Sequence, residues 1–221
     1  VAFGLLKTHA LHASTTDENI YFYMAHLVTQ GKLPYRDFFF AHPPLHVAVP
    51  ALLFSLTGGF HLVFAKAVPA LATALTGWLI LRIGRRLGGA ATGLVAMVLF
   101  LFGAEVLKAS TNLTGINLTT TWMVAGLWAF LGRRYLLAGV LLALAAHTGF
   151  YVIAVPLIFL AILALGDRRA LARMAMGFFP LWLAIFGLCW AVGGQGYLEG
   201  VFFYHWGKPA KGHLLPYVSG F

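Results

Sequence analysis

The chain has 221 residues, of which 61% are hydrophobic and only 10% are charged. Soluble domains carry roughly 25% charged residues, so this composition excludes an ordinary soluble domain and predicts an integral membrane protein. The net charge of +9 does not indicate nucleic-acid binding, because most arginines lie in short clusters between apolar runs. Such clusters are typical of cytoplasmic loops, where they also attract the headgroups of membrane lipids. The clusters are Arg82, Arg85 and Arg86; Arg133 and Arg134; and Arg168, Arg169 and Arg173.

Residues 1–60 are predicted to form the end of a first span followed by an outer loop. The chain begins at Val1 with no initiator methionine and ends at Phe221 in an aromatic stretch, so we expect a fragment of a longer polytopic protein. Asp17 and Glu18 follow a run of Ser and Thr, a pattern that favours a helix start. An amphipathic helix is therefore predicted over residues 17–30. Its predicted apolar face consists of Ile20, Met24, Leu27 and Val28.

A second short helix is predicted after Pro43-Pro44, because proline is tolerated in the first turn of a helix. The apolar run 45–57 ends at Gly58-Gly59 and has 13 residues, fewer than the roughly 20 that a spanning helix needs. We therefore expect it to lie at the membrane interface. If it does not cross, the loop that carries Asp17 faces the outer compartment.

Residues 61–193 are predicted to form a bundle of about six spans of roughly 20 residues or fewer each. The run 135–165 lies between two basic clusters, so it must cross an even number of times, and we divide it at His147–Phe150. Residues 194–221 are predicted to be an outer-facing aromatic segment. The predicted spans are 61–83, 88–102, 116–131, the two halves of 135–165, and 174–192. The predicted fold class is all-α: a polytopic membrane helix bundle with an outer loop of two juxtamembrane amphipathic helices.

This topology places nearly all of the acidic residues on one side of the membrane. Five of the six carboxylates face outward and only Asp167 faces the cytoplasm. A membrane protein that gathers its acids on one side is predicted to bind a cation or perform chemistry there. The five outward acids are Asp17, Glu18, Asp37, Glu105 and Glu199.

The opening loop resembles a known family. The Asp17-Glu18 pair at the start of an amphipathic helix, followed by QGKLPYRDFF and HPPL, is similar to the first outer loop of GT-C fold glycosyltransferases. These include the protein O-mannosyltransferase and aminoarabinose-transferase-like families. The stretch LTGGFHLVFAKAVPALATALTGWLILRIGRRLGG also resembles their second span. The resemblance covers about residues 17–90 and implies transfer of a sugar from a polyprenyl-phosphate donor at the outer face of a bacterial or archaeal plasma membrane.

By this resemblance Asp17 is the catalytic carboxylate, with Glu18 beside it. An acceptor hydroxyl that attacks an anomeric carbon benefits from a carboxylate that takes or orients its proton, and the leaving phosphate benefits from fixed positive charge, for which Arg36, Lys66 and Lys108 are the candidates. Related enzymes often carry another aspartate near the fourth span, where this chain has Asn112 and Asn117. The predicted substrate-binding residues are Arg36, Asp37, His42, Lys66 and Lys108.

Several alternatives stay open. His42 and His46 have the spacing of helical metal ligands, but two prolines separate them and no third ligand is close in sequence, so no metal site is predicted and a requirement for a divalent metal is left open. His61 and His147 are candidate haem or pigment ligands. The chain is alternatively a non-catalytic scaffold subunit that binds other membrane subunits. A transporter is a third possibility, although the chain shows no repeated broken helices.

Overall fold

The computed structural model describes residues 2–12 and 16–204, and all regular structure within these ranges is helical. This confirms the predicted all-α class. The predicted aromatic segment 194–221 lies partly outside the described residues, which include its first part as far as Tyr204. The helices are α1 Ala2–Lys7, η1 His9–His12, α2 Thr16–Thr29, α3 Leu45–Leu56, α4 Leu62–Phe102, α5 Ala104–Ala109, α6 Ile116–Leu131, α7 Tyr135–Thr148, η2 Phe150–Val152, α8 Ala154–Ala164, α9 Arg168–Gly193, α10 Gln195–Leu198 and the π-helical turn η3 Glu199–Phe203.

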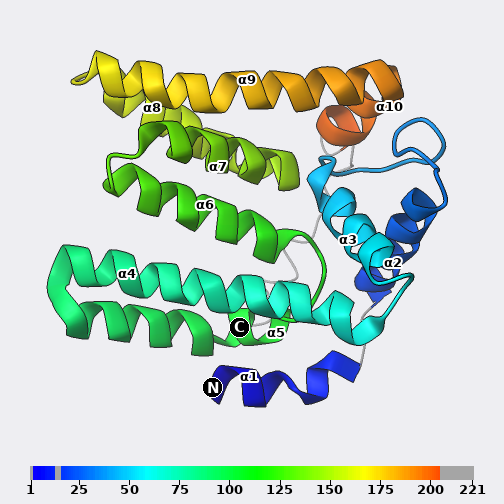
Figure 1. The fold of residues 1–221 in the computed structure, drawn as a ribbon, viewed down its shortest axis with the longest axis horizontal. Coiled ribbons are helices and arrows are strands. Elements are labelled where there is room, and N and C mark those ends of the chain that lie inside the picture. The colour runs from blue at the N-terminus through cyan, green and yellow to red at the C-terminus, as the bar shows by residue number, and fades with distance from the viewer. Residues whose placement is uncertain (1, 13–15, 205–221) are drawn as a thin grey trace, which may run out of the picture.

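The body of the molecule is a stack of roughly parallel and antiparallel helices, in the order α4, α6, α7 and α9 (Figure 1). Glycines bring α7 and α9 into close contact. A Cβ atom on Gly139 would lie 2.2 Å from the carbonyl oxygen of Met174, and one on Gly177 would lie 2.1 Å from that of Leu136. Small residues at such crossings are the usual packing device of membrane helices.

Helix α4 is a hairpin rather than one continuous rod. Gly89 has φ 88° and ψ −179°, and the chain reverses there, so that the two arms run side by side (Figure 1). The arms touch where Gly84 faces Gly93, because a Cβ on Gly84 would lie 2.6 Å from the Cα of Gly93. The reversal falls at the start of the predicted span 88–102, one residue after Gly88.

Helices α2 and α3 pack across one end of the stack (Figure 1). The predicted apolar face of α2 is confirmed in part: Met24 and Val28 pack against the core, whereas Ile20 is exposed and Glu18, Phe22 and Ala25 are the buried residues. The Glu18 carboxylate has its ionic partner Lys66 inside the molecule, on α4. Phe22 and Ala25 follow Glu18 by four and seven residues and therefore share its face.

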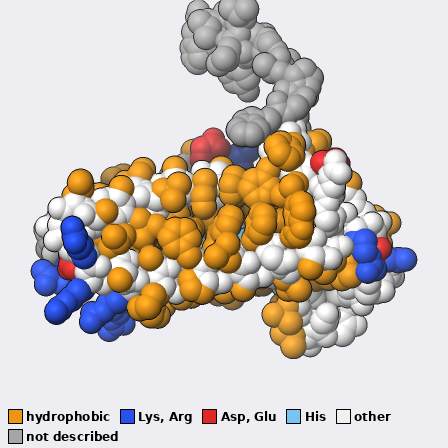
Figure 2. Space-filling view, turned by 90° about the horizontal axis from the view of Figure 1, so that it is seen from above, with side chains coloured by type: hydrophobic (Ala, Val, Ile, Leu, Met, Phe, Trp, Pro, Cys, Tyr) orange, Lys and Arg blue, Asp and Glu red, His pale blue; other side chains and the backbone are white. Residues whose placement is uncertain are grey.

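The two ends of the stack differ in charge. The three arginine clusters come together at the end opposite α2 and α3, where α4 reverses, α6 meets α7, and α9 begins (Figure 1). Figure 2 shows basic side chains gathered at this end and a broad hydrophobic surface between the two ends. Asp167 is the carboxylate of this arginine end, and Asp17, Glu18, Asp37 and Glu199 lie at the end formed by α2, α3, α10 and η3.

Two helices, α4 and α9, are long and apolar enough to cross a membrane. The other segments predicted to span are shorter, with 16 residues in α6, 14 in α7 and 11 in α8. Large hydrophobic side chains are exposed along α8 and α9, including Ile158, Ile162, Leu183 and Leu188. Membrane association is therefore supported at the level of two candidate spans, and the number and direction of further crossings stay predictions.

Candidate functional site

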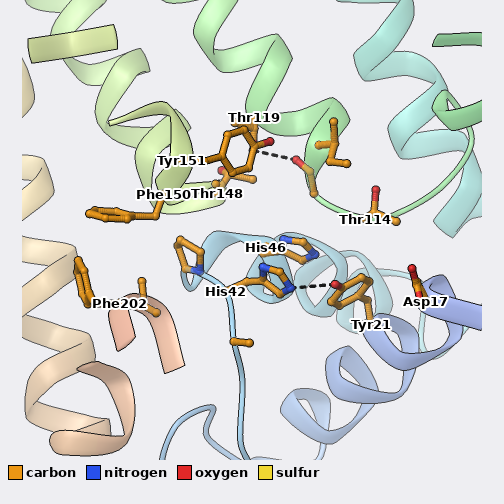
Figure 3. Close-up of a pocket in the computed structure, with 16 residues that line it drawn as sticks. Asp17, Tyr21, His42, His46, Thr114, Thr119, Thr148, Phe150, Tyr151 and Phe202 are labelled. Carbon is orange, nitrogen blue, oxygen red and sulfur yellow. Dashed lines mark hydrogen bonds between the residues drawn. The ribbon is translucent and has the colours of Figure 1, made fainter. Parts of the chain in front are cut away.

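A cavity of about 590 Å³ lies between the end of the stack and the α2–α3 pair (Figure 3). Segments from six parts of the chain meet in its walls: α2, the loop before α3, α3 itself, the start of α6, the α7–α8 connection and η3. The lining residues are Asp17, Tyr21, Ala41, His42, Pro43, His46, Thr114, Gly115, Ile116, Thr119, Thr148, Gly149, Phe150, Tyr151, Val201 and Phe202.

One wall is built from Tyr21, His42 and His46. Pro43-Pro44 start α3, so His42 precedes the helix and His46 lies in its first turn. The two imidazole rings stack, with centroids 4.5 Å apart and planes 17° apart. The hydroxyl of Tyr21 lies 2.9 Å from Nε2 of His42 (Figure 3). The wall therefore presents a phenol and an imidazole in direct hydrogen-bond contact.

Burial sets the protonation of this wall. Desolvation, followed by the neighbouring His42, lowers the pKa of His46 to about 3, because a buried imidazole resists taking a charge. Burial also raises the pKa of Tyr21, and the nearby Asp17 adds to this effect. At neutral pH both side chains are uncharged. Nε2 of His46 is buried and has no hydrogen-bond partner among the described residues.

Gly115 fixes the position of His46. Its φ is +76°, in the left-handed region that favours glycine. A Cβ at this position would lie 2.3 Å from Nδ1 of His46. Glycine is needed here for two reasons: the backbone adopts a positive φ at the turn into α6, and the His46 ring packs directly against the Cα of this residue.

The facing wall combines hydroxyl groups with apolar and aromatic side chains. Thr119 donates to the carbonyl of Gly115 at 2.9 Å, and Thr148 donates to that of Leu144 at 2.8 Å, so their oxygens keep acceptor capacity toward the cavity. Phe150 and Phe202 meet with ring centroids 4.6 Å apart, and Tyr151 lies near Thr119 (Figure 3). A cavity with one polar and one aromatic wall suits an amphiphilic ligand.

Asp17 is the cavity's carboxylate. It lies in the first turn of α2, is exposed, and precedes Tyr21 by one helical turn, so both side chains lie at the same edge of the cavity (Figure 3). It is the one acid among the described residues that line the cavity. Of the two predicted catalytic carboxylates, Asp17 is therefore the one that can reach a ligand there.

Glu18 points the other way. Its Oε2 lies 2.7 Å from Nζ of Lys66, and its Oε1 accepts a hydrogen bond from the backbone N–H of Leu113 at 2.8 Å. The exposed fractions of the two charged side chains are 0% for Glu18 and 1% for Lys66. Neither lines the cavity. This geometry gives Glu18 and Lys66 a structural role: they join α2 to α4 and to the loop before α6.

The other predicted binding residues are also apart from the cavity, except His42. Arg36 and Asp37 form an ion pair on the exposed loop, with Nε and Oδ1 3.0 Å apart. Hydrogen bonds from Arg36 and from the backbone of Leu33 lower the pKa of Asp37 to about 2. Lys108 is exposed on α5. Within the described ranges, no Lys or Arg lines the cavity.

The described residues contain no group of three or more His, Cys, Asp or Glu side chains that could hold a metal ion. His42 and His46 stack face to face, a geometry that directs their ring nitrogens outward from the pair rather than toward one shared ion. His147 is buried, and its Nε2 lies 3.1 Å from the carbonyl of Trp182. Asn117 donates to the carbonyls of Ala109 and Asn112 and so closes the loop before α6.

Sequence reasoning missed Tyr21, the threonines and the aromatic wall. Tyr21 follows Asp17 by four residues, so the period of the helix could have shown that the two side chains lie on the same face. Thr148 and Phe202 had no such signal, because their elements approach the cavity only in the folded molecule.

Compared with protein-family models, with curated proteins and with solved structures, the chain gives no match. The function must therefore be argued from the site itself.

Proposed function

We propose that the protein is a GT-C-like glycosyltransferase that moves a sugar from a polyprenyl-phosphate donor to an acceptor hydroxyl at the outer face of the membrane. The observation that carries the proposal is the place of Asp17, a single exposed carboxylate at the edge of an amphiphilic cavity. The resemblance of the opening loop to this enzyme class adds to it.

The chemistry assigns separate tasks to Asp17 and to the wall formed by Tyr21 and His42. The acceptor oxygen forms a bond to the anomeric carbon, the bond from that carbon to the donor phosphate breaks, and Asp17 takes the acceptor proton. The departing phosphate carries away the electron pair of the broken bond. Since no Lys or Arg lines the cavity within the described residues, hydrogen bonds from His42 and Tyr21 are the available stabilisation for this charge.

The aromatic wall has the character that a polyprenyl donor requires. Phe150, Tyr151 and Phe202 form an apolar side next to the polar one, so an isoprenoid chain can pack on the rings while its phosphate and sugar meet Tyr21 and His42. The hydrophobic surface of α8 and α9 (Figure 2) fits a protein whose substrate arrives from the lipid phase.

The test is sugar transfer by the purified protein in vesicles, with a panel of polyprenyl-phosphate sugars and a hydroxyl acceptor. We expect Asp17→Asn to lower the transfer rate on the order of 10²-fold or more, the range for loss of a general base. Asp37→Asn is the matched control, because Asp37 is a carboxylate in the same loop that does not line the cavity. Full activity of Asp17→Asn, or an equal loss in both variants, would refute the role of Asp17.

One observation favours a second function, a non-catalytic scaffold subunit of a membrane complex. No Lys or Arg lines the cavity and no metal-ligand group is present among the described residues, so a leaving phosphate there meets neither of these cationic side chains nor a metal. A scaffold would show no transfer with any donor of the panel, and it would co-purify with other membrane subunits at a fixed ratio.

A further inference from the structure

The arginine end, defined as Arg82, Arg85, Arg86, Arg133, Arg134, Arg168, Arg169 and Arg173, is a dense and uncompensated positive surface. All eight side chains are exposed, and none pairs with a carboxylate in the described chain, whose ion pairs are Arg36–Asp37 and Glu18–Lys66. Asp167, the acid at this end, accepts a hydrogen bond from the backbone N–H of Ala170 at 2.9 Å and caps α9.

Clusters far apart in the sequence form one surface here. A Cβ on Gly132 would lie 3.8 Å from Nη1 of Arg86, so the turn between α6 and α7 lies against the reversal of α4. The start of α9 reaches the same end of the stack (Figures 1 and 2). Guanidinium groups held together by the fold create a local positive potential that separate loops would not.

Two of these arginines rest on tryptophan rings. The Cζ atom of Arg82 lies 5.5 Å from the ring centroid of Trp78, and that of Arg134 lies 5.4 Å from the ring of Trp128. Such cation–π contacts hold the guanidinium group against the bundle. Tryptophan itself favours the boundary between lipid and water.

Leucines are exposed directly beside the arginines. The exposed fraction is 68% for Leu87, 51% for Leu136 and 91% for Leu165, and each is within three residues of an arginine of this surface. A purely polyanionic partner such as nucleic acid would leave these leucines in water. A lipid surface accepts both groups, with the leucines at the acyl chains and the arginines at the phosphates.

We propose that the arginine end binds the headgroups of anionic phospholipids. Arginine binds phosphate in a bidentate fashion, and each basic residue near an anionic membrane surface contributes about 1 kcal/mol. This binding does not depend on the proposed transfer reaction, which takes place at the opposite end of the stack.

The test uses the whole protein in neutral-detergent micelles, titrated with phosphatidylglycerol or with phosphatidylcholine. The readout is tryptophan fluorescence, since Trp78 and Trp128 lie under the arginines. We expect saturable binding of phosphatidylglycerol that weakens with added salt, and no saturable binding of phosphatidylcholine. Arg133→Gln with Arg134→Gln should weaken the phosphatidylglycerol affinity about 30-fold, from about 1 kcal/mol for each charge.

The matched control removes two charges away from the arginine end, Lys32→Gln with Lys108→Gln; both lysines are exposed. We expect this control to bind phosphatidylglycerol as the wild type does. Equal responses to the two lipids, or an equal loss in both double variants, would overturn the proposal. A single-stranded oligodeoxynucleotide that binds as tightly as phosphatidylglycerol would overturn the assignment to lipid. None of these outcomes depends on glycosyl transfer.

Discussion

Separating Glu18 from Lys66 is the sharpest perturbation of this fold. Nζ of Lys66 lies 2.7 Å from Oε2 of Glu18, and both side chains are shielded from water. Lys66→Met leaves the buried carboxylate with the Leu113 N–H as its described hydrogen-bond donor. Removing one member of a buried pair typically costs about 3–5 kcal/mol, because the remaining charge is uncompensated. We expect Lys66→Met to lower the free energy of unfolding by an amount in this range.

Glu18→Gln should destabilise in the same way, because Lys66 then keeps a buried charge. Its amide oxygen can still accept from Leu113, so the backbone hydrogen bond is preserved. The double variant removes both charges of the pair and should cost less than the sum of the two single variants, with a coupling energy of about 2–3 kcal/mol between the two sites. A fully additive double variant would refute the pairing of these side chains.

The assay is equilibrium unfolding in mixed detergent micelles, followed by far-ultraviolet circular dichroism of the helices. For a chain of 150–250 residues, about 1 kcal/mol shifts the melting temperature by about 2–4 °C, so the single variants should melt roughly 6 °C or more below the wild type. The control is Asp37→Asn, which breaks an exposed pair that contributes little. A single variant that melts with the wild type would also contradict the argument.

Three further predictions concern the loop and the cavity. Gly115→Ala should destabilise the protein by about 2 kcal/mol more than Gly58→Ala. Both glycines have positive φ, but only at Gly115 would the new Cβ atom clash with a neighbour, the His46 ring. Thermal melts of the two variants measure this difference. The pKa of His46 is about 3 in the folded protein and roughly 6.5 in the unfolded chain. Between these two pH values the unfolded chain binds a proton at His46 that the folded protein does not bind. The free energy of unfolding therefore falls as the pH drops from about 6.5 toward 3. The slope approaches about 1.4 kcal/mol for each pH unit, and His46→Gln should remove it in melts across this range. The pKa of Asp37 in the folded protein is about 2. The contribution of its pair with Arg36 to stability is therefore present above about pH 4 and is lost as the pH falls toward 2. This pH-dependent change in stability is small, and Asp37→Asn should abolish it.

Helix ends were the most predictable part of the fold. The predicted runs 45–57 and 116–131 correspond to Leu45–Leu56 and Ile116–Leu131, and α7 ends at Thr148, within the predicted turn at His147–Phe150. Prolines, glycines and arginines mark such ends locally, and each acts through its own backbone or charge. This is why a single sequence is enough to find them.

The site was less predictable because it depends on distant partners. Glu18 and Lys66 are 48 residues apart, and no local pattern shows that a carboxylate at a helix start points inward instead of toward a ligand. Ile20 is exposed on the same helix, which the apolar pattern alone could not reveal. Asp17 was named from the family resemblance of the opening loop, in which His42 also lies, whereas Phe202 reaches the cavity only through the packing of η3.

The reach of Glu18 along the chain has a consequence for how the protein is made. Lys66 and the backbone N–H of Leu113, which hydrogen-bond to it, follow it by 48 and 95 residues. Synthesis proceeds from the N-terminus, so α2 leaves the ribosome long before either partner exists. The hydrogen bonds of Glu18 to Lys66 and Leu113 can both be present only after both arms of α4 and the loop before α6 have been synthesised. The complete Glu18 network therefore forms only after more than a hundred residues of the chain have been made.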